Sequence, residues 1–141
     1  MNQPAAPSPV AGAAARRHHL TAAPEHLHWG YWDAALAPVL RVQPGDIVDI
    51  DCLSGGPDDL PPPALGYTVL PEHHECHQRV AKGTGAHILT GPVHVDGARP
   101  GDVLEVRIHD IRLRQDWGWN IFRGLMGTLP DQFPYARRIH L

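Results

Sequence analysis

The chain has 141 residues, and its 14 glycines and 15 prolines make about a fifth of all positions poor helix formers. Long helical bundles and coiled coils are therefore excluded. The formal net charge of −3 argues against a nucleic-acid-binding domain, because such domains carry a basic surface. No apolar run approaches the roughly 20 residues that a membrane-spanning helix needs. The unusual feature of the composition is its 11 histidines.

Residues 1–17 are predicted to form a disordered arm. Ala, Pro, Ser and Gly dominate this stretch and offer little apolar surface to bury. The short basic cluster at 16–19 is interpreted as a solvated flank. The arm lacks the basic and apolar regions of a secretory signal, so a cytoplasmic location is expected. Two cysteines, Cys52 and Cys76, provide no disulfide framework.

Alternating apolar residues predict strands at 39–42 and 47–52. Between them, Pro44-Gly45 is typical of a type II turn, because proline presets φ at the first central position and glycine accepts a positive φ at the second. The Pro-Gly-Asp phrase returns at 100–102 and is followed by a predicted strand at 103–114. The apolar phase of that strand slips at His109-Asp110, which indicates a bulge or a bend.

The remaining elements complete a mainly β domain over residues 18–141. Residues 87–95 form a broken strand interrupted at Gly91-Pro92, and 71–80 is the one predicted helix. Two alternating strands that each follow a Pro-Gly-Asp turn favour an antiparallel, sandwich-like fold. The candidate strands are too few to close a sandwich, so the fold is expected to be incomplete and to need another segment over its core.

Five segments in this order resemble the N-terminal part of the acetamidase/formamidase family. The unusual Thr-Gly-Pro and Trp-Gly-Trp sequences make the resemblance specific, although a Pro-Gly-Asp turn alone is common. The segments are His26–Asp33, Pro44–Val48, His87–Val93, Gly97–Val106 and Asp116–Trp119.

The resemblance implies a mainly β hydrolase that acts on the C–N bond of small linear amides and releases ammonia. Family members are longer than this chain, so the resemblance also implies that the chain corresponds to the N-terminal half of an enzyme. It would then be a truncated product, one subunit of a split enzyme, or a relic.

Amide hydrolysis needs a nucleophile, a group that stabilises the oxyanion, and a proton for the leaving nitrogen. The chain has no Gly-x-Ser-x-Gly sequence, and a thiol at Cys52, at the end of an apolar strand, is expected to be buried and inert. Water activated by a carboxylate or a metal is the better nucleophile. A divalent metal such as zinc is one candidate for this activation, and the sequence does not identify the metal.

His28 and Asp33 form the first candidate group, among the aromatic residues of 29–32. One interpretation is that they are a polar pair in a pocket with aromatic walls. The alternative is that this stretch is the tryptophan-rich edge of the core, with its histidines hydrogen-bonded to the backbone. Asp51, at the end of a predicted strand, and Asp116 are candidate ligands or orienting groups. Further candidates, predicted to line the substrate pocket, are Trp117, Trp119 and His87.

A separate histidine cluster lies on the predicted helix. His73 and His77 are four residues apart and share one helix face, which is competent for two metal ligands. Without an identifiable third ligand, the cluster is interpreted as part of a polar surface helix.

The sequence therefore predicts an amidase domain that binds a small amide and no nucleic acid or membrane. The first alternative is a non-catalytic fragment, or a subunit of a split amidase that needs a partner chain. The second is a small metal-binding β-barrel that uses the His73–His77 cluster. An exposed apolar sheet face predicts either self-association or a complementing chain.

Overall fold

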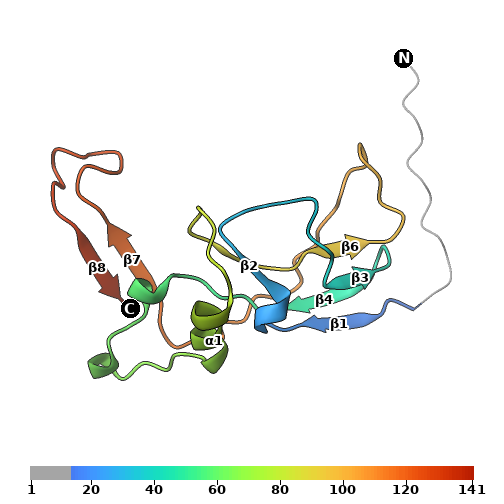
Figure 1. Ribbon diagram of the computed structural model, residues 1–141, viewed down its shortest axis with the longest axis horizontal. Helices are drawn as coiled ribbons and strands as arrows, with labels where there is room; N and C mark the ends of the chain where they lie inside the picture. The colour runs from blue at the N-terminus through green and yellow to red at the C-terminus, as the bar shows by residue number, and fades with distance from the viewer. Residues whose placement is uncertain (1–13) are drawn as a thin grey trace, which may run out of the picture.

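The computed structural model describes residues 14–141, so most of the predicted arm lies outside the described residues. The elements are β1 (Arg17–Leu20), β2 (Leu27–Trp29), β3 (Leu40–Val42), β4 (Ile47–Ile50), α1 (Pro71–Arg79), β5 (Ile88–Thr90), β6 (Val93–Val95), β7 (Trp119–Phe122) and β8 (Arg137–His140) (Figure 1). Three single-turn 3-10 helices cover Pro24–His26, Pro57–Asp59 and Pro63–Leu65. No helix in this part of the chain is long and apolar enough to cross a membrane.

The fold is mainly β, as predicted, and it is built from four two-stranded sheets. β2–β5 and β7–β8 are antiparallel, whereas β1–β4 and β3–β6 are parallel. The strands on either side of the Pro44-Gly45 turn therefore do not pair with each other. β3 joins β6 and β4 joins β1, which was not expected from a tight turn between two strands. Residues 17–19 of the basic cluster, which was expected to be a solvated flank, belong to β1.

The two Pro-Gly turns have the predicted geometry. Gly45 has φ +92°, and the Asp46 amide donates to the Gln43 carbonyl at 3.0 Å. Gly101 has φ +96°, with the equivalent bond from Asp102 to Arg99, also at 3.0 Å. Positive φ at the second central position is the mark of a type II turn.

Asp46 ties its turn to β1. Its carboxylate accepts hydrogen bonds from the amides of Gln43 and Arg16, both at 3.0 Å, and lies 2.9 Å from Nε2 of His18. The Gln43 amide, His18 and the Arg16 amide, in that order, lower the pKa of Asp46 to about 2. The charged carboxylate is therefore favoured in the folded state.

Acid is expected to weaken this connection. The pKa of Asp46 is lower in the folded than in the unfolded chain, so its stabilising effect is complete above about pH 4 and is lost as the pH falls toward 2. Urea unfolding of Asp46→Asn should show a smaller loss of stability over that interval than the unsubstituted chain. Asp131→Asn, at an exposed loop carboxylate, is the matched control and should keep the original pH dependence.

Helix α1 packs on β2 and β5. It begins at Pro71, where the missing amide proton of proline costs nothing, as the sequence predicts. Its buried side contradicts the interpretation of a polar surface helix, because His73 and Cys76 are both completely buried. The small core around them consists of Ala22, Leu27, Trp29, Leu53, Cys76 and Ile88, with Leu70 and Val80 at its edge.

The two cysteines lie in different environments. Cys52 is exposed, which contradicts the prediction of a buried thiol, and Cys76 is the buried one. Burial raises the pKa of the Cys76 thiol. Cys76 is therefore a neutral core residue rather than a nucleophile.

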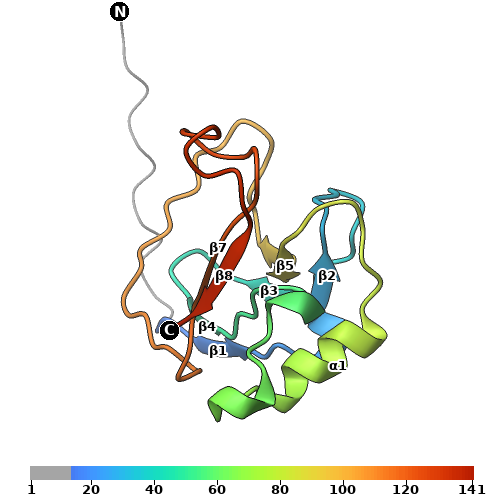
Figure 2. The same cartoon turned by 90° about the vertical axis from the view of Figure 1, so that its left-hand side faces the viewer.

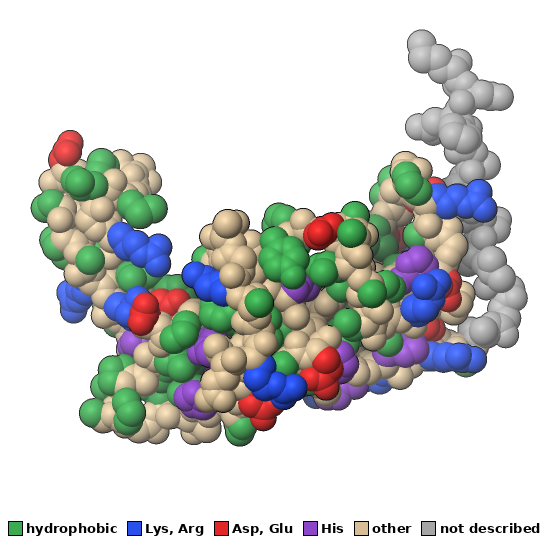
Figure 3. Space-filling model, viewed as in Figure 1, with side chains coloured by type: hydrophobic (Ala, Val, Ile, Leu, Met, Phe, Trp, Pro, Cys, Tyr) green, Lys and Arg blue, Asp and Glu red, His purple; other side chains and the backbone are tan. Residues whose placement is uncertain are grey.

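β7 and β8 form an antiparallel arm that extends from the body, and a hollow separates the arm from the body (Figures 1 and 3). The sequence showed no periodicity here and predicted no strand. Phe122, Phe133 and Tyr135 pack edge to face within the arm, with ring centroids 5.4 to 6.3 Å apart. Figure 3 also shows histidines at several separate places on the body, so their number does not reflect one cluster.

The segment at 103–114 differs most from prediction. It is extended but pairs with no strand, and it makes no backbone–backbone hydrogen bond to any described residue. Its apolar side chains are 69% to 95% exposed: Val103, Leu104, Val106, Ile108, Ile111 and Leu113. The alternating sequence has the composition of a strand, but no strand within residues 14–141 pairs with it through backbone hydrogen bonds.

Candidate active site

A cavity of about 420 Å³ lies beside the β2–β5 pair. Its wall combines two ionisable side chains and one hydroxyl with an apolar surface, which is the usual composition of a small-molecule site. The lining residues are His28, Trp32, Asp33, Ala34, Leu36, Leu89, Thr90 and Pro92.

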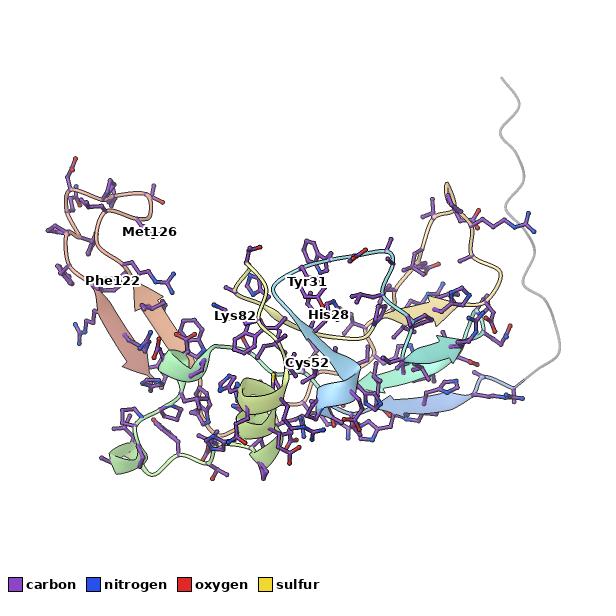
Figure 4. All side chains as sticks on the ribbon, viewed as in Figure 1. His28, Tyr31, Cys52, Lys82, Phe122 and Met126 are labelled. Atoms are coloured by element: carbon purple, nitrogen blue, oxygen red, sulfur yellow. The ribbon has the colours of Figure 1, made fainter. Side chains whose placement is uncertain are left out.

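β2 places His28 in this wall. Leu27 and Trp29 are buried on the core side, so His28 between them projects to the opposite face of the strand. Its ring lies 5.6 Å from that of Tyr31, and the two side chains are neighbours in Figure 4. The Nδ1 atom of His28 is buried and has no hydrogen-bond partner among the described residues. An unpaired buried nitrogen is uncommon in folded proteins and is often found at functional sites.

Gly30 turns the chain from β2 toward the cavity rim. It has φ +84°, and its amide donates to the His87 carbonyl at 2.8 Å. A Cβ at this position would lie 2.5 Å from the Gly85 carbonyl oxygen. The Gly83 and Gly85 amides in turn donate to the carbonyls of Trp29 and Gly30. Glycine is therefore required here both by the backbone angle and by the close approach of a second loop.

Asp33 lies on the exposed rim. Its Oδ1 atom accepts a hydrogen bond from the Ala35 amide at 2.8 Å, and the Leu36 amide bonds to the Asp33 carbonyl at 3.2 Å. This short Asx-type turn fixes the orientation of the carboxylate. His28 and Asp33 are the two predicted catalytic residues that share one cavity.

Asp51 contacts the cavity only through its backbone. Its carbonyl accepts the Thr90 hydroxyl hydrogen bond at 2.8 Å. Its carboxylate instead lies 3.1 Å from His19 Nε2 and 3.5 Å from Arg114 Nε, and Arg114 also pairs with Glu72. These contacts join β1, the end of β4, α1 and the end of the 103–114 segment. Asp51 therefore occupies an ion-pair network at the molecular surface.

The other predicted residues lie apart from the cavity lining. Asp116 accepts a hydrogen bond from the Thr68 amide at 3.1 Å, and Trp117 donates to the Thr68 carbonyl at 2.9 Å. The Trp119 indole lies against Gly55. His87 is exposed, and its carbonyl is occupied by the Gly30 amide. Their predicted roles in binding or catalysis therefore remain predictions.

His73 is the most unusual histidine. It is fully buried, its ring stacks 6.2 Å from Trp117, and it lies 4.9 Å from the His77 ring. Neither of its ring nitrogens has a hydrogen-bond partner within residues 14–141. Desolvation, and next the nearby His77, lower the pKa of His73, so the folded state favours the neutral ring.

This histidine should make the fold acid-sensitive. Because its folded pKa lies below the ordinary value of 6.5, stability is complete above that pH and decreases as the pH falls through it. His73→Leu should remove part of this decrease and hold or raise stability at neutral pH, since leucine leaves no polar atom unpaired. His74→Leu, at the exposed neighbouring position, is the control. Equal acid sensitivity in both variants, measured by urea unfolding at pH 7.5 and 5.5, would contradict this account.

No three His, Cys, Asp or Glu side chains come together as a metal-ligand group in the described part of the chain. His77 bonds to the Gly55 carbonyl at 3.1 Å, and His140 bonds to the Asp59 carbonyl at 2.9 Å. The residues at 14–141 therefore do not by themselves supply a three-ligand zinc site.

Comparison with known proteins shows the relationship directly. A model described as the Acetamidase/Formamidase family matches residues 16–140. The chain belongs to the acetamidase/formamidase family. It is 30% identical over 113 residues to a formamidase of Methylophilus methylotrophus, in a match that covers 76% of this chain and 25% of that protein. No solved structure matches the chain significantly.

The family match extends over every candidate residue, from His28 to Trp119. The chain spans about a quarter of the formamidase it resembles, which is less than the half expected from the sequence. Sequence reasoning missed the cavity residue Thr90 and the burial of His73. Thr90 belongs to the Thr-Gly-Pro sequence that carried the resemblance, so its position offered a signal. The burial of His73 depends on packing by distant residues and offered none.

Proposed function

We propose that this chain contributes the substrate pocket of a hydrolase that cleaves the C–N bond of small linear amides such as formamide or acetamide. The observation that carries the proposal is the shared cavity of His28 and Asp33 in a member of the acetamidase/formamidase family. A small amide has an N–H₂ donor end, a carbonyl acceptor and at most a short alkyl group. The cavity offers a carboxylate, an imidazole and an apolar wall for these three parts.

In the proposed reaction, the substrate –NH₂ group donates to the Asp33 carboxylate, which its turn holds at the rim. The imidazole of His28 takes a proton from a water molecule as that water attacks the carbonyl carbon. The C–N bond then breaks, and the same proton passes to the leaving nitrogen. Ammonia and the carboxylic acid are the products, and His28 returns to its neutral form.

The test is ammonia release from formamide and acetamide by the purified chain. We expect ammonia release above the rate in buffer with both amides. Release that is the same in the presence and absence of the chain would contradict activity of the isolated chain. It would favour the second candidate described next.

The second candidate is a subunit of a split amidase that acts only with a complementing chain. The predicted residues are separated in the structure, which favours this candidate. His28 and Asp33 line the cavity, whereas Asp51 contacts Arg114 and Asp116 contacts the Thr68 amide. In that case, formamide would still bind at the His28 cavity, but turnover would require addition of the second polypeptide. Binding without turnover distinguishes this candidate from the first.

A further inference from the structure

The extended segment at 103–114 has an unpaired backbone within residues 14–141, a feature that is independent of amidase activity. In Figure 2 it follows the left-hand margin of the molecule as a ribbon without an arrow. Its backbone amides and carbonyls bond to no backbone group in the described part of the chain. A long, exposed, apolar strand of this kind is a template for pairing with another chain.

The charged side chains show how this segment is oriented. Glu105 pairs with Arg107 at 2.5 Å, and Asp110 pairs with Arg112 at 2.6 Å. In extended backbone, residues two apart lie on the same face, so each pair marks one face of its half of the segment. The apolar residues Leu104, Val106 and Ile108 alternate with the first pair, and Ile111 and Leu113 alternate with the second.

The order of these residues is self-complementary when the segment is read from both ends toward the middle. Antiparallel alignment of two copies, centred between Ile108 and His109, sets Leu104 against Leu113 and Val106 against Ile111. The same alignment sets Glu105 against Arg112 and Arg107 against Asp110. Every apolar residue in these pairs meets an apolar residue, and every charge meets an opposite charge. Such cross-strand pairs are the units that stabilise a sheet.

Other registers lack this property. A shift of the pairing by two residues in one direction opposes Arg107 and Arg112, and in the other direction it opposes Glu105 and Asp110. Like charges directly opposite each other are destabilising. A shift by one residue opposes apolar and charged side chains. The sequence therefore selects one register.

The slip in apolar phase near His109 also has a role in this arrangement. In a regular strand, Glu105 and Arg112 would point to opposite faces, and a two-fold symmetric pair could not bring them together. A bulge or bend at the centre returns the second half to the face of the first. The bulge or bend lies where the two-fold axis of the strand pair would pass. The two halves of the segment can therefore pair in the same way on either side of the axis.

We propose that residues 103–114 form an antiparallel, two-fold symmetric strand pair with the same segment of a second copy of this chain. The pairing satisfies the free backbone groups of both segments and brings their apolar side chains together. Arg114 anchors the end of each segment to its own body through Glu72 and Asp51. The partner that the charge pattern fits is thus another molecule of the same protein.

Charge-reversal variants test the pairing. The first variant is Glu105→Arg with Asp110→Arg, which makes the four alternating charges positive, and the second is Arg107→Glu with Arg112→Glu, which makes them negative. The substituted side chains are exposed, and ion pairs between exposed residues contribute little to folding. Each variant places like charges opposite each other in its own dimer, but the two variants complement one another in a mixture.

Sedimentation velocity should show the unsubstituted chain as a dimer. Each variant alone should dissociate, with a dimer dissociation constant raised at least about tenfold. An equimolar mixture should recover dimers that native mass spectrometry identifies as one copy of each variant. That recovery would also show that neither variant had simply failed to fold. A monomeric unsubstituted chain, variants that dimerise as well as it does, or a mixture without heterodimers would each overturn the proposal.

Discussion

Gly30→Ala is expected to destabilise the domain by about 3 kcal/mol. An alanine at φ +84° costs about 1–2 kcal/mol in backbone strain. Its Cβ would also meet the Gly85 carbonyl oxygen at 2.5 Å and the Gly85 nitrogen at 2.8 Å, so one backbone must move, at a further cost of about 1–3 kcal/mol. The movement would separate the 83–85 loop from the end of β2 and displace the rim that carries Asp33. Urea unfolding measures the loss directly.

Gly45→Ala is the matched control for this prediction. Gly45 also has a positive φ, of +92°, but a Cβ there would meet nothing within 4 Å. The stability lost by Gly45→Ala should therefore be limited to the backbone strain of about 1–2 kcal/mol. Equal losses in the two variants would show that the contact between Gly30 and Gly85 contributes nothing, and would contradict the close packing described here.

His28→Ala is expected to lower kcat/KM for formamide by about 10²-fold or more, the usual effect of removing a general base. The proposed role requires an imidazole that accepts a proton, so His28→Gln should be impaired to a similar degree although it retains a hydrogen-bonding side chain. Ammonia release under single-turnover and steady-state conditions separates loss of chemistry from loss of binding. Circular dichroism and urea unfolding check that both variants are folded.

His94→Ala is the control for this measurement. His94 lies on β6, is part-exposed, and contacts Asp96 at 3.5 Å rather than the cavity. Its removal should leave kcat/KM within about twofold, as expected for a part-exposed side chain that does not line the cavity. A His28→Ala variant that remains as active as His94→Ala would exclude His28 as the base.

Local sequence signals predicted the turns and the helix well. Pro44-Gly45 and Pro100-Gly101 form the expected turns because the preferences of proline and glycine act within four residues. Pro71 begins α1 for an equally local reason. The pairing of β1 with β4 and of β3 with β6 was not predictable, because parallel partners come from distant parts of the chain.

In the site, too, the features set by neighbouring residues were predictable and those set by distant residues were not. His28 and Asp33 lie close in the sequence, and the Gly30 turn brings both to one cavity. Asp51 and Asp116 looked equally suitable as isolated carboxylates, but Arg114 and the Thr68 amide contact them instead. The choice between an ion pair and a catalytic role depends on which distant side chain reaches the carboxylate. Alternation and composition do not carry that information.

We propose that the His28 cavity binds a small amide, whether or not the chain turns it over alone. Titration of isotope-labelled chain with acetamide, followed by two-dimensional NMR, measures this directly. We expect saturable shifts at the His28 ring and at the Thr90 and Asp33 amides, with the His94 ring unchanged. Shifts confined to the Trp117 and Trp119 indoles, or no saturable shift at His28, would contradict it.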